Sequence, residues 1–300
     1  RIVGEGIAGF ADVDRILREA AGFRMGPFEL LDLTGLDVSH PVMKSIYDQY
    51  YQEPRFRPSP ITRQRLAAGL LGRKSGRGFY VYRDGKAEVP AEDAPPPRTD
   101  VPVWVSRRNV EAATRVTALL ESLGARLDRG DTPGAGSLCL VLPLGEDATT
   151  GALAEGLDPA RTLALDPLAL DGRRTLMRTP LTQREMRDAA WALFAADGTP
   201  VTVINDSPGF VVQRVLATIV NIGCDIAQQR VATAEDIDRA VTLGLGYPKG
   251  PLALGDALGA RTVLAILDAI HDFYRDPRYR PSPWLVRRAR LGVSLLTPEN

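Results

Sequence analysis

Two glycine-rich stretches of the sequence have residue types that could bind an anionic group. Gly4, Gly6 and Gly9 match the G-x-G-x-x-G spacing of a dinucleotide-binding loop, in which a helix N-terminus faces a pyrophosphate. Such a loop follows a strand, and little sequence precedes Gly4. The segment 233–241 is similar to the one that follows Gly9, but no glycines stand before it. We therefore expect a loop between helices here, with a nucleotide site as the alternative.

The second stretch runs from Lys74 through Ser75 and Gly76 to Gly78, and it leads into the aromatic segment 79–82. Consecutive backbone N–H groups in a glycine-rich turn can hold an anion. Glycine turns are also a common means of reversing the chain. The sequence favours a chain-reversing loop that brings the aromatic side chains into the core, with anion binding as the alternative.

One motif occurs twice, and the rest of the chain is organised around it. Asp32 and Asp256 are 224 residues apart, and the two Gly-Pro pairs have the same separation. Proline suits the first position of a helix, and the glycine before it tolerates backbone angles that other residues resist. Each copy predicts a tight turn followed by a short, mostly buried helix. The first copy contains Phe23, Met25, Gly26, Pro27, Phe28 and Asp32, and the second contains Tyr247, Gly250, Pro251, Leu252 and Asp256.

The duplication extends over a whole domain. The segments 54–60 and 277–283 share the pattern Pro-Arg-aromatic-Arg-Pro-Ser-Pro and are 223 residues apart. This period far exceeds the roughly 20–50 residues of solenoid repeats. Apolar residues at helical spacing predict a long helix over 211–229, whose counterpart would precede residue 1. We therefore expect the first copy to be truncated at its N-terminus.

The segment between the copies has a different composition. Residues 84–100 are rich in proline, small and charged residues, which predicts a semi-rigid linker. Strands then alternate with helices, which is typical of an α/β layer with a parallel sheet. The loop 145–150 lies where such a sheet binds ligands, but it lacks a phosphate cradle and favours an N-capped helix start. We expect strands at 103–105, 137–143, 161–165 and 200–204, and helices at 110–123 and 182–196.

The composition excludes several classes of protein. The 300 residues contain 37 basic and 37 acidic side chains, so no net charge favours nucleic acid or an anionic membrane. No apolar run is long enough to span a membrane, and no metal-binding pattern is present. Cys139 and Cys224 lie among apolar residues, so we expect buried, reduced thiols in a cytoplasmic protein.

The second copy resembles the C-terminal domain of the 3-hydroxyacyl-CoA dehydrogenases. The resemblance rests on Asp206-Ser-Pro-Gly-Phe-Val-Val-Gln213-Arg214, Asp236-Ile-Asp238 and Gly246-Tyr-Pro-Lys-Gly-Pro251. The first copy is similar through Gly22 to Asp32 and through Gly76-Arg-Gly-Phe-Tyr80. Residues 101–204 look like the later half of the family's NAD-binding domain. The whole pattern resembles bacterial members with two C-terminal domains, including those of phenylacetate and adipyl-type acyl-CoA breakdown.

The resemblance implies an α+β multidomain fold. Two related all-helical domains, 1–83 and 205–300, would flank the linker 84–100 and a degenerate Rossmann-like α/β domain over 101–204. The family oxidises the 3-hydroxyl group of acyl-CoA with NAD, as in fatty-acid β-oxidation, and uses a histidine–glutamate pair as general base.

This chain departs from the family's catalytic pattern. Its two histidines, His40 and His271, both lie outside 101–204, and no family-type histidine stands near Asp166. Gln213 occupies the position of a family asparagine. The resemblance implies that NAD and the catalytic pair belong to an N-terminal domain absent from this chain. The chain alone would then be inactive, with no catalytic or cofactor-binding residue.

The resemblance also implies what the chain could do. In the family, the helical domains close over the acyl-CoA substrate and mediate dimerisation, so we expect either a homodimer or an intrachain pseudo-dimer. The motif residues and Gln213 are the candidates for substrate closure or for contact between the helical domains. The alternatives are a non-catalytic scaffold and an acyl-CoA-binding module in which the loop Lys74–Gly78 touches the coenzyme's phosphates.

Overall fold

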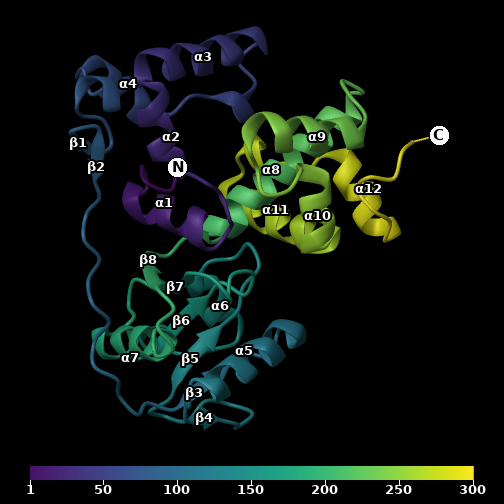
Figure 1. Cartoon of the computed structure of the whole chain (residues 1–300). Helices are drawn as coiled ribbons and strands as arrows, with labels where there is room; N and C mark the ends of the chain where they lie inside the picture. The colour runs from purple at the N-terminus through teal and green to yellow at the C-terminus, as the bar shows by residue number, and fades with distance from the viewer. Residues whose placement is uncertain (300) are drawn as a thin grey trace.

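The computed structural model describes residues 1–299 and places two helical parts side by side, with a sheet below them (Figure 1). The first helical part contains α1 (Phe10–Glu19), α2 (Pro27–Thr34), α3 (Leu36–Gln49) and α4 (Pro60–Ala67), followed by the hairpin β1 (Val81–Arg83) and β2 (Lys86–Glu88). The second contains α8 (Val211–Gln228), α9 (Ala234–Leu245), α10 (Pro251–Leu258), α11 (Ala260–Tyr274) and α12 (Pro283–Leu291).

The segment that lies between the helical parts in the sequence forms a six-stranded sheet with the order β4-β3-β5-β6-β7-β8. Its strands are β3 (Val103–Val105), β4 (Leu127–Asp128), β5 (Leu138–Val141), β6 (Thr162–Leu165), β7 (Arg174–Arg178) and β8 (Val201–Ile204). Its helices are α5 (Val110–Ser122), α6 (Ala148–Ala154) and α7 (Arg184–Phe194). The predicted alternation of strands and helices is confirmed. The α/β architecture is therefore as expected from the apolar runs.

The predicted parallel sheet departs from the prediction at one pair of strands, because β7 runs antiparallel to β6. The connection 166–173 is shorter than the roughly twelve residues that a parallel crossover needs. It therefore reverses the chain directly. The helix α7 then provides a full crossover, and β8 is parallel to β7.

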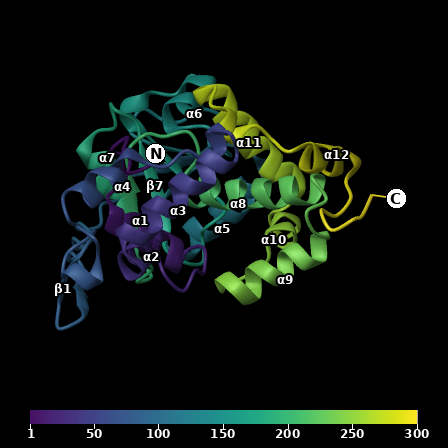
Figure 2. The same cartoon turned by 90° about the horizontal axis from the view of Figure 1, so that it is seen from above.

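Helices cover both faces of the sheet (Figures 1 and 2). Apolar side chains of α5 and α7 pack on one face, against Leu138, Leu140 and Leu163. The other face packs against α6, the start of α8 and α1 of the first helical part, through side chains that include Ile16 and Phe210. This burial on both faces explains why β5 and β6 are continuous apolar runs.

In the second helical part, α8 is the central helix and contacts α9, α10, α11 and α12. Ala217, Val220 and Cys224 of α8 are buried against these neighbours, and the predicted long helix is present. Cys224 on α8 and Cys139 on β5 are buried free thiols. Within residues 1–299, no helix has the length and apolarity that crossing a membrane requires.

The first residues of the expected linker are folded. Lys86–Glu88 pairs with Val81–Arg83 in an antiparallel hairpin, and the chain then runs extended to the sheet. The loop at residues 2–8 contains turns and leads into α1, so the structure has a loop where the glycine spacing could also suggest a nucleotide site.

Candidate functional site

Each copy of the repeated motif holds an aspartate against the first turn of a helix. Asp14 accepts hydrogen bonds from two amides at the start of α2, at 2.9 and 3.0 Å. Asp238 accepts the same pair at the start of α10, at 2.7 and 2.8 Å. These amides have no partner within the helix, and the helix dipole favours an anion there. Burial nevertheless raises the pKa of Asp14 to about 6.

The glycines before these helices are required by close contact. Gly26 and Gly250 have φ values of −74° and −64°, which other residues adopt readily. The expectation of an unusual backbone angle is therefore wrong. A Cβ atom on Gly26 would lie 2.2 Å from the carboxyl carbon of Asp14. One on Gly250 would lie 2.3 Å from the Cβ of Asp238. Pro27 and Pro251 take the first helical positions, as predicted.

Asp32 of the first motif and Asp256 of the second each accept hydrogen bonds within their own copy. Asp32 accepts hydrogen bonds from the amides of Phe79 and Tyr80 at 2.8 and 2.9 Å. Asp256 accepts the amide of Leu295 at 2.8 Å. Each carboxylate thus ties a later segment to its own helical part. Neither carboxylate therefore contributes a hydrogen bond between the two copies, because each accepts from amides of its own copy.

The two residues that follow the glycine-rich loop, Phe79 and Tyr80, bind the carboxylate of Asp32 through their amides, whereas the amides of the loop itself have other acceptors. The amides at positions 75, 76 and 78 donate to the carbonyl groups of Gly72, Arg73 and Tyr80. The Nζ of Lys74 pairs with Asp37 at 2.6 Å, and the Ser75 hydroxyl bonds backbone groups of the loop. These donors are therefore already engaged. The arrangement contradicts a phosphate site at Lys74–Gly78 and agrees with the chain-reversing loop.

The two copies meet at the aromatic residue that follows the first glycine of each motif. The rings of Phe23 and Tyr247 make an edge-to-face contact with centroids 5.0 Å apart. Met25 is exposed, and Leu252 is fully buried within its own copy. One contact between the copies thus lies at the start of each motif.

A second contact between the copies is reciprocal. Arg55 donates to the carbonyl of Arg280 at 3.2 Å, and Arg278 donates to the carbonyl of Arg57 at 3.2 Å. These pairs are equivalent positions in the repeated Pro-Arg-aromatic-Arg segments. When two equivalent residues each donate the same hydrogen bond to the other copy, the interface has two-fold symmetry. Arg55 also pairs with Asp225 of α8.

A largely apolar groove of about 450 Å³ lies between the copies. Pro27, Phe28 and Tyr247 of the motifs line it, together with residues of α8. Arg1, Arg214 and Arg278 border it. The Nη2 of Arg214 donates to the Ser207 hydroxyl at 2.6 Å, while its Nε and Nη1 are buried without hydrogen-bond partners. The Nε of Arg278 is likewise buried and unpartnered.

Gln213 fastens α8 to the carboxyl ends of β5 and β6. Its Nε2 donates to Asp166 at 3.0 Å and to the carbonyl of Pro143 at 3.1 Å, while its Oε1 accepts from Gly145 at 2.8 Å. The second carboxylate oxygen of Asp166 has no partner. Burial raises the pKa of Asp166 to about 6. Because this carboxyl group is fully buried, it cannot act as a base on a molecule bound at the surface.

A cavity of about 310 Å³ lies at the carboxyl ends of β3 and β5, where the strand order reverses and α/β sheets usually bind ligands. Arg108 pairs with Glu146 at 3.0 Å, and Ser106 donates to Glu155 at 2.6 Å. The connection from β3 to α5 contains no glycine. Asp147 caps α6 through the amide of Thr150, as predicted. The cavity therefore lacks a phosphate cradle, and its two glutamates would repel a pyrophosphate.

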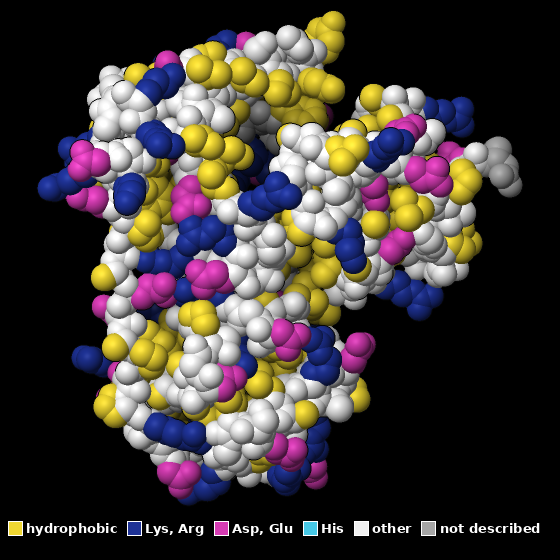
Figure 3. Space-filling view, viewed as in Figure 1, with side chains coloured by type: hydrophobic (Ala, Val, Ile, Leu, Met, Phe, Trp, Pro, Cys, Tyr) yellow, Lys and Arg dark blue, Asp and Glu magenta, His cyan; other side chains and the backbone are white. Residues whose placement is uncertain are grey.

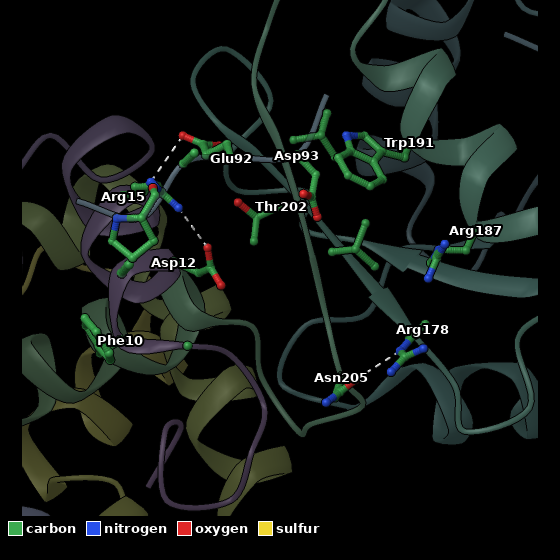
Figure 4. A pocket seen from close by; sticks show the side chains of 16 residues that line it. Phe10, Asp12, Arg15, Glu92, Asp93, Arg178, Arg187, Trp191, Thr202 and Asn205 are labelled. Atoms are coloured by element: carbon green, nitrogen blue, oxygen red, sulfur yellow. Dashed lines mark hydrogen bonds and ion pairs between the residues drawn. The ribbon is translucent and has the colours of Figure 1, made fainter. Parts of the chain in front are cut away.

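A further cavity, of about 560 Å³, is bounded by α1, the extended linker and the edge strand β8 (Figure 4). Arg15, Arg178 and Arg187 line it together with Asp12, Glu92 and Asp93, so its charges balance. Glu92 lies 3.2 Å from Arg15 and accepts two hydrogen bonds from Arg173, at 2.7 and 2.9 Å. The bonds from Arg173 lower the pKa of Glu92. These ion pairs hold the linker against the body.

We expect Glu92→Gln to release this linker. The substitution removes the anion shared by Arg15 and Arg173, so local opening of residues 89–100 should become roughly tenfold more frequent, which corresponds to about 1.4 kcal/mol. Limited proteolysis would measure the cleavage rate within this segment. Asp93→Asn is the matched control, since Asp93 lines the same cavity and has no ion pair within residues 1–299. Equal cleavage rates in the two variants would contradict the assignment.

Neither histidine is among the residues that line the cavities described above, although Thr62, the hydrogen-bond partner of His40, lines the apolar groove. His40 shares a hydrogen bond with Thr62 at 2.9 Å, and His271 lies in the last turn of α11. Residues 1–299 contain no group of acidic, histidine or cysteine side chains suited to a metal ion.

Comparison with known proteins gives a consistent picture. The sequence profile of the 3-hydroxyacyl-CoA dehydrogenase C-terminal domain matches residues 1–82 and 209–294. The chain is 32% identical over 298 residues to 3-hydroxyadipyl-CoA dehydrogenase of Escherichia coli K12, covering 97% of this chain and 56% of that protein. It is 36% identical over 110 residues to 3-hydroxybutyryl-CoA dehydrogenase of Clostridioides difficile, covering 37% of this chain and 39% of that protein.

Solved structures agree with these matches. The crystal structure of 3-hydroxybutyryl-CoA dehydrogenase from Escherichia coli K12 superposes with a TM-score of 0.76 at 30% identity, covering 97% of this chain and 56% of that one. The fold is shared with Mycobacterium tuberculosis FadB2, at a TM-score of 0.51 and 21% identity, over 95% of this chain and 90% of that one. The chain spans about half the length, or less, of the first two relatives named above.

Proposed function

The chain belongs to the 3-hydroxyacyl-CoA dehydrogenase family, and from that premise we propose that it is the C-terminal region of an NAD-dependent enzyme that oxidises 3-hydroxyacyl-CoA to 3-oxoacyl-CoA. Its role there is to close over the acyl-CoA substrate and to pair helical domains. The observation that carries this proposal is the repeated hydrogen bonding of an aspartate to the first turn of a helix, which we call the aspartate clamp. Asp14 and Asp238 hold α2 and α10 in the same way, in the two segments that the family profile matches.

The domain division forms part of the proposal. Two C-terminal-type helical domains, 1–83 and 205–300, flank the linker 84–100 and the α/β domain 101–204. The reciprocal bonds of Arg55 and Arg278 support an intrachain pseudo-dimer of the helical domains. The pairing takes place inside one chain in this proposal. The location is cytoplasmic.

The α/β domain of this chain is non-catalytic in the proposal. The cavity at the carboxyl ends of β3 and β5 is lined by Glu146 and Glu155 and has no glycine cradle. Asp166 is fully buried and hydrogen-bonded to Gln213. NAD and the histidine–glutamate pair would be supplied by another domain. The acyl-CoA-binding module is the weaker candidate, because the donors of the Lys74–Gly78 loop are engaged within the chain.

We expect the purified chain to form no NADH from NAD and 3-hydroxybutyryl-CoA. NADH fluorescence should also remain unchanged on titration with the chain, because no phosphate cradle is present. The Escherichia coli 3-hydroxyadipyl-CoA dehydrogenase serves as the positive control in both assays. Turnover by the chain alone would refute the proposal. Calorimetric titration with acetoacetyl-CoA separates the remaining candidates, since binding of the thioester alone would favour the module.

A further inference from the structure

The strand β8 is an edge of the six-stranded sheet and pairs with β7 on one side only. The amide of Arg174 in β7 donates to the carbonyl of Pro200 at 2.9 Å. Arg174 lies opposite Val201 in the register. A parallel ladder with this bond continues through the backbone of Thr202, so the amides and carbonyls of Val201 and Val203 point away from β7.

The next outward amide along the edge, that of Asn205, already pairs with another segment. It donates to the carbonyl of Ile7 at 2.9 Å, in the loop before α1. In the described part of the chain, the outward groups of Val201 and Val203 have no such partner. Unpaired backbone groups at a sheet edge are a template for a further extended chain.

The linker passes beside this edge without pairing with it. Residues 90–93 and 201–203 line the same cavity of about 560 Å³. The segment 90–97 contains four prolines, which have no amide hydrogen to donate to a neighbouring strand. Figure 3 shows basic and acidic side chains gathered beside the linker, at the level of α1 and β8 in Figure 1. These charged groups hold the linker in place, and the gap beside β8 remains open.

The charges around the gap differ between the two faces of the sheet. Arg178 at the end of β7 and Arg187 of α7 lie on one side of the cavity, and Asp12 and Arg15 of α1 lie on the other (Figure 4). Asp12 and Arg15 pair with each other at 3.2 Å, and Arg187 pairs with the next residue of α7. Arg178 donates one hydrogen bond through its Nε and forms no ion pair within residues 1–299. The remaining acid of the lining, Asp93, lies on the linker.

We propose that the edge of β8 binds an extended acidic segment of a partner protein as a seventh strand. The backbone of this segment pairs with the outward groups of Val201 and Val203, and every second side chain points toward α7. A carboxylate on that face binds Arg178, and an apolar side chain beside it packs on Trp191, which also lines the cavity. The free backbone groups require an extended chain, and the unpaired guanidinium selects an acidic one.

Fluorescence anisotropy tests the edge with a defined probe. A labelled short peptide that alternates glutamate with threonine is titrated with the whole chain. We expect saturable binding, at least about tenfold tighter than that of a peptide with lysine in place of glutamate. Arg178→Ala should weaken the binding roughly tenfold, because a hydrogen bond between charged groups is lost. Arg184→Ala is the matched control, since Arg184 is an exposed residue of α7 that does not line the cavity.

The backbone pairing has a separate test. Val203→Pro removes an outward amide that does not bond β7, so the sheet should remain intact while the affinity falls at least about fivefold. Thermal denaturation of this variant checks the fold. A peptide methylated at its backbone nitrogens should lose the same affinity against the unchanged chain, which gives a measurement that does not depend on the stability of a variant.

Other results would overturn the proposal. These are the absence of saturable binding, equal binding of the lysine peptide, and binding that neither Val203→Pro nor methylation of the peptide weakens. Equal competition by free glutamate would show that Arg178 binds small carboxylates and not a strand. A dimer of the chain that Val203→Pro converts to monomer would show that a second copy occupies the edge. The assays of dehydrogenase activity are independent of all these outcomes.

Discussion

Gly250→Ala is expected to lower the free energy of unfolding by about 3 kcal/mol, because the new methyl group has no space. It would lie 2.3 Å from the Cβ and 2.5 Å from the Cα of Asp238. Since a backbone atom is involved, a change of rotamer cannot relieve the contact. Either α9 moves away from α10, or Asp238 loses the two amides that it caps. Thermal denaturation should show a fall in Tm of about 8 °C.

A glycine in the neighbouring helix provides the control. Gly244 lies inside α9, and a Cβ atom there would have no heavy atom within 4 Å. Gly244→Ala should therefore raise stability by about 0.5–1 kcal/mol through helix propensity alone. An unchanged Tm in Gly250→Ala would mean that the aspartate clamp does not limit the packing of α9 on α10.

The clamp shows how far the sequence can predict this fold. Asp14 and Asp238 stand at the same place in both copies, and their repetition could be found by counting residues. The spacing also predicted the helices after Pro27 and Pro251, because helix-start signals are local. The reason for the glycines could not be found in this way, since the close approach of Asp14 to Gly26 depends on how two helices pack.

Other features depend on contacts between distant segments. The antiparallel direction of β7 follows from a short connection whose length could have been counted, but the apolar pattern of the strand does not show direction. The partner of Asp32 lies 47 residues further along the chain, at Phe79. The roles of Arg55 and Arg278 emerge only when the two copies are placed together. The repeated Pro-Arg segments are visible in the sequence, but their pattern gives the period of the duplication and not the contact between them.

The sequence alone does not predict the environment of Asp166. It marks the place where a family-type histidine is absent. In the structure it lies at the carboxyl end of β6, where one oxygen accepts from Gln213 and from the amide of Leu168. No cation of residues 1–299 forms an ion pair with it. A buried carboxylate held by neutral donors alone keeps much of its desolvation cost.

Asp166→Asn is accordingly expected to stabilise the protein near pH 7.5. Burial raises the pKa of Asp166 from 3.8 to about 6 in the folded state. The folded protein thus binds the proton more tightly than the unfolded chain between these pH values. Stability from this group is fully present below the unfolded value and is lost as the pH rises through about 6. The loss approaches about 3 kcal/mol, of which we expect the amide to restore about 2 kcal/mol.

The pH dependence separates this effect from a general change in packing. Near pH 4, Asp166 is protonated in the folded state, so the wild-type protein and Asp166→Asn should have nearly equal stability. Chemical denaturation at pH 4, 6 and 7.5 would follow the difference. Asp197→Asn should behave in the opposite way, because hydrogen bonds from Arg174 hold the pKa of Asp197 well below its usual range. That variant loses stability at neutral pH, and its deficit shrinks as the pH falls. A stability difference for Asp166→Asn that is independent of pH would show that the buried carboxyl group is not ionised in the folded protein.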